Sequence, residues 1–116
     1  MAQSPPIGRV DLPDEITLAP MGDLDPHTGP ALAQAVAAAL SESDAERVRI
    51  DLGAVDIVDS SGLRALLDAD RMCRAAGREL IVSDPGPAAR RILAITALDA
   101  RLTIAQTELA PPGEGS

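Results

Sequence analysis

Residues 47–63 read RVRIDLGAVDIVDSSGL, and the hydrophobic period changes from strand-like to helix-like within this stretch. Apolar and charged residues alternate along 47–52, which predicts a strand with Val48, Ile50 and Leu52 on its buried face. A short apolar run at 54–58 then carries the chain to Asp59, and a helical apolar period starts at Ser61. A strand that leads through a tight corner into a helix is typical of an α/β domain.

The rest of the chain repeats this alternation. Strands are predicted at 15–21, 79–83 and 101–105, with a turn-rich loop at 22–30. Three helices are predicted: one with Pro30 in its first turn, one that starts at Ser61 and stops at Gly77, and one with Pro87 in its first turn. The expected buried positions on the last two helices are Leu63, Leu66, Leu67, Cys73, Ile92 and Ile95. We therefore expect one α/β domain with a mixed, mostly parallel β-sheet and packed α-helices.

The domain boundaries follow from the composition of the two ends. Residues 1–8 and 108–116 are rich in Pro, Gly and Ser and poor in large apolar side chains. Such segments have little surface to bury, so both are expected to be flexible tails that flank a domain at 9–107.

Charge and composition exclude several classes of partner. The chain has 116 residues, 46% of them hydrophobic, with a net charge of −8 and no Phe, Tyr or Trp. An acidic chain without aromatic side chains offers neither a basic groove nor stacking platforms, which argues against nucleic acid and against an anionic membrane surface. A basic protein partner is favoured instead.

The ten basic residues are all Arg. The absence of Lys excludes a Walker A nucleotide site and Schiff-base chemistry, and it argues against a response-regulator receiver domain, which also relies on a lysine. Cys73 is the only cysteine, which indicates a reducing compartment, and no signal-peptide core or membrane-spanning run is found. We expect a cytoplasmic protein.

The corner Asp59-Ser60-Ser61-Gly62 permits a structural and a functional interpretation. Asp and Ser are favoured helix N-caps, and Gly62 lets the backbone tighten. The same geometry projects a serine hydroxyl at the edge of the sheet where α/β folds bind ligands, beside the positive end of a helix. A serine hydrolase is disfavoured because the G-x-S-x-G elbow is missing and because His27, the only histidine, would have to lie near Ser60.

The loop 22–30 contains Asp23, Asp25 and His27. Their spacing suggests a metal site, but carboxylates in a Pro/Gly-rich loop are more often turn formers and helix caps. We expect neither a metal nor a cofactor.

Four segments together resemble the STAS domain of the anti-sigma factor antagonist family. They are GDLD at 22–25 with Thr28, VRIDL at 48–52, VDSSGL at 58–63 and GPAARR at 86–91. The likeness covers nearly all of residues 10–106. The two prolines at 26 and 30 depart from the family pattern, since each disfavours helix in the preceding residue, so the first helix is expected to start late, near Gly29.

The resemblance implies a switch without catalysis of its own. The unphosphorylated antagonist would bind an anti-sigma factor that is also a serine kinase of the histidine-kinase-like ATPase fold, and this binding would release a sigma factor. The kinase would phosphorylate Ser60, the serine directly after the corner aspartate, and a metal-dependent serine phosphatase would reverse the reaction. The implied partner-binding residues are Asp23, Asp25, Asp59, Ser60, Ser61, Gly62 and Leu63.

Two points stay open at this level. Ser61 is expected to serve mainly as part of the helix cap, because it lies one step deeper in the turn than Ser60. The alternative function is a STAS subunit that supports the ATPase of an ABC transporter, in which Ser60 need not be phosphorylated.

Overall fold

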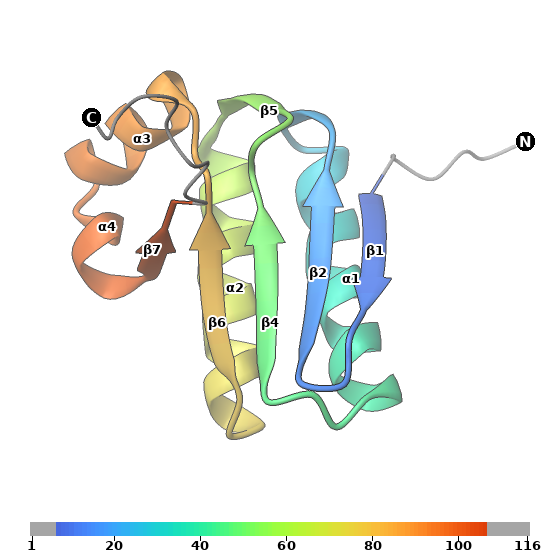
Figure 1. The fold of residues 1–116 in the computed structure, drawn as a ribbon. Coiled ribbons are helices and arrows are strands. Elements are labelled where there is room, and N and C mark those ends of the chain that lie inside the picture. Colours follow the sequence, from blue (N-terminus) through green and yellow to red (C-terminus); the bar gives the residue numbers. More distant parts are fainter. Residues whose placement is uncertain (1–6, 107–116) are drawn as a thin grey trace, which may run out of the picture.

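A five-stranded sheet forms the centre of the computed structural model, which describes residues 7–106 (Figure 1). Its strand order is β1-β2-β4-β6-β7. The strands are β1 (Ile7–Asp11), β2 (Glu15–Pro20), β4 (Arg47–Asp51), β6 (Glu79–Ser83) and β7 (Thr103–Ala105). Only β1 runs antiparallel to its neighbour among these described strands. The predicted α/β class with a mixed, mostly parallel sheet is confirmed.

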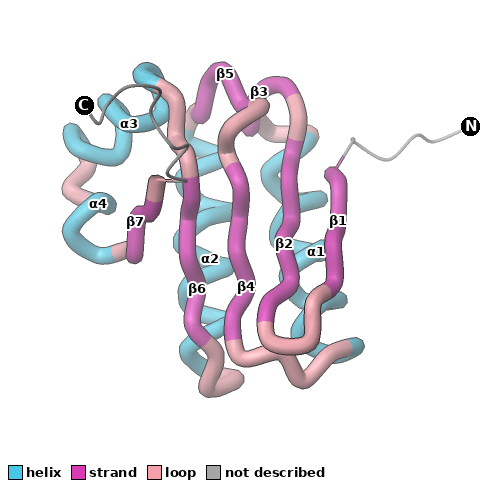
Figure 2. The backbone as a smooth tube through the Cα atoms, in the orientation of Figure 1, coloured by secondary structure: helices cyan, strands magenta, loops and turns pink. Residues whose placement is uncertain are grey.

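Two long helices cover one face of this sheet, and the corner at residues 59–62 lies beyond the carboxyl ends of its central strands. Helices α1 (Thr28–Glu42) and α2 (Ser60–Ala75) pack against each other behind the sheet (Figures 1 and 2). Helices α3 (Pro87–Ile95) and α4 (Leu98–Arg101) lie on the β7 side. A separate two-stranded parallel sheet, β3 (Gly22–Leu24) with β5 (Val55–Val58), sits where β2 and β4 end.

The core is built from aliphatic side chains between the sheet and the helices. Val48, Ile50 and Leu52 are fully buried while Arg47 and Arg49 are not, so the predicted alternation along this strand is confirmed. The remaining large core side chains come from β2, β6 and the helices: Ile16, Leu18, Leu24, Leu32, Val36, Leu66, Val82 and Leu93.

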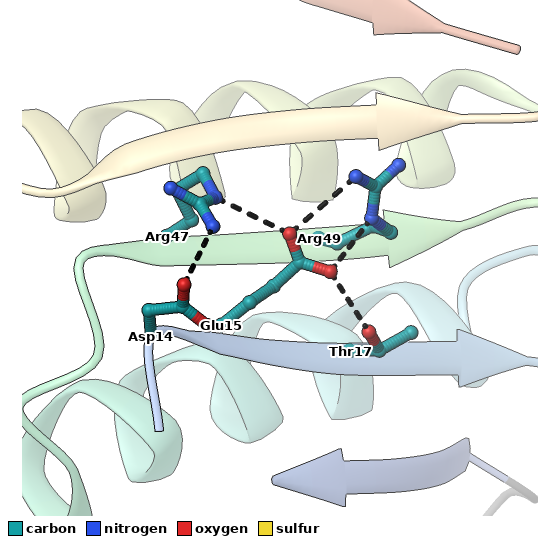
Figure 3. Close-up of polar contacts among 5 residues, drawn as sticks. All are labelled: Asp14, Glu15, Thr17, Arg47 and Arg49. Atoms are coloured by element: carbon teal, nitrogen blue, oxygen red, sulfur yellow. Dashed lines mark hydrogen bonds and ion pairs between the residues drawn. The ribbon is translucent and has the colours of Figure 1, made fainter. Parts of the chain in front are cut away.

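The other face of the sheet carries an ion-pair cluster (Figure 3). Arg49 Nε donates to Glu15 Oε2 at 2.9 Å, and Arg47 Nε donates to Glu15 Oε1 at 3.3 Å. Arg47 also reaches Asp14, and the Thr17 hydroxyl lies 3.5 Å from Glu15 Oε2. Hydrogen bonds from Arg49 and then Arg47 hold the pKa of Glu15 below its usual value. The cluster therefore joins β2 to β4 on the solvent side of the sheet.

Helix α2 ends as the sequence predicts. Gly77 has a positive φ of 71°, its N–H donates to Arg74 O, and the Arg78 N–H donates to Cys73 O, which together form a Schellman motif. Near this end, Arg74 pairs with Asp70 one turn earlier at 2.9 Å, and Arg101 approaches the same carboxylate at 3.6 Å. Burial raises the pKa of the Cys73 thiol to about 11.

Several details differ from the sequence-based expectations. Leu67 is half-buried and lies outside the core, because the buried face of α2 passes through Ala65, Leu66, Ala69 and Cys73. Ile95 is 70% exposed, because Ala89 and Leu93 set the buried face of α3 and Ile95 lies two residues beyond Leu93.

The chain ends and the first loop also differ. Strand β1 begins at Ile7, inside the segment expected to be a tail, and Gly22–Leu24 forms a strand where a loop was predicted. The tails expected at 1–6 and beyond 106 fall outside the described residues. Within residues 7–106 no helix combines the length and hydrophobicity needed to span a bilayer.

Candidate functional site

The corner between β5 and α2 is organised by the Asp59 carboxylate. Asp59 is extended, with φ −97° and ψ −169°, and its Oδ1 accepts hydrogen bonds from Ser61 N at 2.8 Å and from Gly62 N at 3.1 Å. These are the second and third amides of the helix, so Asp59 is the N-cap. The expectation that Ser61 serves as the cap is wrong, because β5 delivers Asp59 one residue before the helix, where its carboxylate reaches both amides.

Ser60 is the first helical residue and is exposed. Within the described part of the chain, no hydrogen bond involves its hydroxyl group. The side chain lines a surface hollow of about 640 Å³ between α1 and α2. Its other lining residues are Gly29, Pro30 and Ala33 on α1 and Ser61, Leu63, Arg64, Ala65, Leu67 and Asp68 on α2. Ser60 is thus the accessible hydroxyl at the mouth of a mostly apolar hollow.

Two glycines bring three elements into close contact beneath Ser60. A Cβ on Gly62 would lie 2.6 Å from Leu24 Cβ and 2.9 Å from Val58 Cγ1. A Cβ on Gly29 would lie 2.9 Å from the Ser61 carbonyl oxygen. Since real Cβ atoms do not approach this closely, glycine at both positions lets β3, α1 and α2 meet at the corner.

The first loop is tied to the corner and to the start of α1. Asp59 N donates to Leu24 O at 3.0 Å, which places the loop beside the corner. Asp25 Oδ1 accepts from His27 N and Thr28 N, each at 2.9 Å, and Thr28 Oγ1 donates to Asp23 O at 2.6 Å. Helix α1 begins at Thr28, one residue before the expected start near Gly29.

The two loop carboxylates therefore differ in their surroundings. Hydrogen bonds from the Thr28 and His27 amides hold the pKa of Asp25 below its usual value, so this side chain is engaged within its own loop. Asp23 is exposed. The Asp-x-Asp spacing is explained by a turn, and within residues 7–106 no cluster of three or more His, Cys, Asp or Glu side chains could hold a metal ion.

The structure brings all the sequence-predicted site residues to one end of the molecule. The corner residues 59–63 lie beside loop 23–25 through the pairing of Leu24 with Val58. Two exposed apolar side chains, Met21 and Ile57, each lie two residues before a carboxylate of this surface.

Sequence reasoning missed the part of the hollow that lies along the helices, including Arg64, Leu67 and the small residues of α1. A signal was present in the sequence. Residues 28–41 contain no charged side chain although the chain as a whole carries a net charge of −8. A helix without charges on its outer side is unusual for a solvated surface.

Comparison with known proteins identifies the family. The family model described as "Mlab, STAS domain" matches residues 9–106, and the chain belongs to the STAS domain family. The resemblance inferred from the four sequence segments is thereby confirmed.

Solved structures with the same fold include anti-sigma factor antagonists and a transporter protein. An anti-sigma factor antagonist from Mycobacterium paratuberculosis is 28% identical, with a TM-score of 0.75 over 86% of this chain and 84% of that chain. The unphosphorylated anti-sigma factor antagonist SpoIIAA is 17% identical, with a TM-score of 0.74 over 88% and 90% of the two chains. A sulfate transporter family protein from Wolinella succinogenes is 17% identical, with a TM-score of 0.70 over 83% and 79%.

Proposed function

We propose that this protein is an anti-sigma factor antagonist whose binding to an anti-sigma factor is switched off by phosphorylation of Ser60. The observation that carries the proposal is the accessible Ser60 hydroxyl at the first position of α2, beside a corner that Asp59 already caps. A phosphate on Ser60 would break no hydrogen bond of the described structure. The 28% identity to an anti-sigma factor antagonist supports the same class of function.

The surface around Ser60 is suited to sense that modification. Asp23 and Asp59 already make this end of the molecule acidic, and a phosphate adds roughly −1.5 to −2 charges. A partner surface that accepts a neutral hydroxyl would then meet like-charge repulsion and a desolvation cost. A loss of about 3 kcal/mol weakens binding roughly a hundredfold, which is enough to change partner.

The proposed docking surface comprises Asp23, Asp25, Asp59, Ser60, Ser61, Gly62 and Leu63. Asp25 and Gly62 contribute by shaping the backbone, whereas Asp23 and Ser60 offer exposed side chains. The proposed partners are an anti-sigma factor with serine kinase activity and a metal-dependent serine phosphatase. The chain itself needs no catalytic group for this role.

The test is phosphorylation by candidate kinases with ATP and Mg²⁺, followed by mass spectrometry. Trypsin releases residues 50–64 as one peptide that contains both serines, so fragment ions must separate Ser60 from Ser61. We expect one phosphate, on Ser60. Ser60→Ala should abolish phosphorylation and retain anti-sigma factor binding, whereas Ser61→Ala should still be phosphorylated. Phosphate on Ser61 alone, or on neither serine with every kinase, would refute the proposal.

The second candidate function is a STAS subunit that supports a transporter ATPase. The fold is shared with a sulfate transporter family protein, so the architecture is compatible with that role. Affinity purification from the native cell distinguishes the two functions by the protein that co-purifies. The first function predicts a kinase. The second predicts a transporter ATPase, which Ser60→Ala should retain as well as the unsubstituted chain does.

A further inference from the structure

We propose that Arg64 binds the phosphate group of phosphorylated Ser60. The inference rests on the proposed phosphorylation of Ser60 and extends it to the phosphorylated state. It assigns a phosphate-binding role to a residue that lies outside the corner motif.

The positions of the two side chains support the pairing. Ser60 and Arg64 are four residues apart on α2, so their side chains emerge on the same face of the helix, with Cβ atoms about 5–6 Å apart. Both residues line the hollow between α1 and α2. A phosphate on Ser60 would therefore lie within reach of the long Arg64 side chain, which can offer two parallel N–H donors to it.

Arg64 is free to move to the phosphate. Its side chain is 76% exposed, and its contact in the unmodified protein is with Asp68 Oδ1 at 4.0 Å. That same oxygen accepts a shorter bond from Arg71 Nη1 at 3.4 Å. When Arg64 turns toward Ser60, Asp68 keeps Arg71, so the rearrangement leaves no carboxylate unpaired.

The phosphate has few alternatives at this corner. The second and third helix amides already donate to Asp59 Oδ1. The α1 side of the hollow contributes Gly29, Pro30 and Ala33, which carry no charge, and Arg64 is the one cationic side chain among the described residues that line it. The nearest anion along the chain, Asp59, repels the phosphate and pushes it toward Arg64.

The pairing has a consequence for the switch. In the unmodified protein the hollow presents a neutral hydroxyl together with an available guanidinium group. In the phosphorylated protein the phosphate on Ser60 and the Arg64 guanidinium group bind each other. The phosphate then lies along the helix, across the mouth of the hollow. Phosphorylation would thus remove an available cation from the hollow beside the docking surface as well as add negative charge to that surface.

The test uses phosphoserine incorporated at position 60 during translation, so that it does not depend on any kinase. The second pKa of the phosphate is measured by ³¹P NMR in the full chain, in Arg64→Gln and in the matched control Arg71→Gln, which lies about three turns from Ser60. The series is repeated with His27→Gln, which removes the only imidazole of the chain from the comparison.

We expect the phosphate pKa in the unsubstituted chain and in Arg71→Gln to lie roughly 0.3–0.5 unit below that in Arg64→Gln, since a cation favours the dianion. Equal values in the unsubstituted chain and Arg64→Gln would overturn the pairing. The pairing would also be overturned if Arg71→Gln raised the phosphate pKa as much as Arg64→Gln does. The shift would then come from the general electrostatic field of α2. Failure of every kinase to modify Ser60 would refute the proposed function but leave this result unaffected.

Discussion

Asp59 joins two tasks at the corner. Its backbone N–H binds the first loop through Leu24 O, and its carboxylate caps α2. Because the Asp59 carboxylate caps the helix, neither Ser60 nor Ser61 is needed as a side-chain cap. That division leaves the Ser60 hydroxyl available for modification.

Replacing each capping candidate separates these roles. Asp59→Ala should lower the free energy of unfolding by about 1 kcal/mol, because two helix amides lose their acceptor. Ser61→Ala should change it by no more than about 0.5 kcal/mol. Urea denaturation of both variants measures the difference, and a larger loss in Ser61→Ala than in Asp59→Ala would restore Ser61 as the cap.

A second prediction at this scale concerns Gly62. A methyl group there meets Leu24 and Val58 at less than 3 Å, so Gly62→Ala should destabilise the protein by about 1–3 kcal/mol or more. Gly8→Ala is the control, because its nearest neighbours lie at 3.7 Å or beyond. Equal denaturation midpoints for the two variants would show that the corner can relax around a side chain.

At the scale of the element, the central strands are stabilised differently on their two faces. One face of β2 and β4 packs against α1 and α2. On the other face, Arg47 and Arg49 of β4 form ion pairs with Glu15 of β2. The polar side chains of these two alternating strands therefore help to hold β2 and β4 together. It also leaves these arginines less available as a basic docking patch.

Glu15→Gln tests that cluster. It should lower the free energy of unfolding at pH 7 by about 0.5–1 kcal/mol, as expected for a partly exposed pair. The pKa of Glu15 is lowered in the folded state, so its stabilisation is present above the unfolded pKa and is lost as the pH falls through the folded pKa. Denaturation at pH 7 and at pH 3 should show the difference from the unsubstituted chain shrinking in acid. Asp14→Asn, at the exposed end of the cluster, should have the smaller effect.

At the scale of the whole molecule, α1 and α2 cover one face of the sheet, and the site lies beyond the carboxyl ends of the central strands (Figure 1). The strands β4 and β6 each have a partner on both sides, whereas β1 and β7 are the two edges. The corner between β5 and α2 thus lies, along the chain, between two interior strands of the sheet.

Hydrogen exchange should reproduce that arrangement. We expect the amides of β4 and β6 to exchange most slowly and those of β1 and β7 faster, because edge strands open without disrupting the core. Exchange followed by mass spectrometry on the native protein measures this order. Fast exchange in β4 would contradict the assignment of the core.

The sequence by itself determined the elements whose signal is local. The alternation along 47–52, the helical period after Ser60 and the stop at Gly77 are written in neighbouring residues, because burial on one face imposes a period of two or of about 3.6. The corner motif and the family resemblance are local in the same sense. These features were sufficient to predict the α/β class and to select Ser60.

Only the tertiary structure decided the features that depend on residues far apart in the chain. Glu15 pairs with arginines more than thirty residues away, β3 pairs with β5, and β1 joins the sheet with an exposed pattern that carries no alternation. The choice of Asp59 as the cap and the place of Arg64 beside the hollow depend on how β5 and α1 approach α2. Such contacts arise from packing between elements, which no periodicity within a single segment can encode.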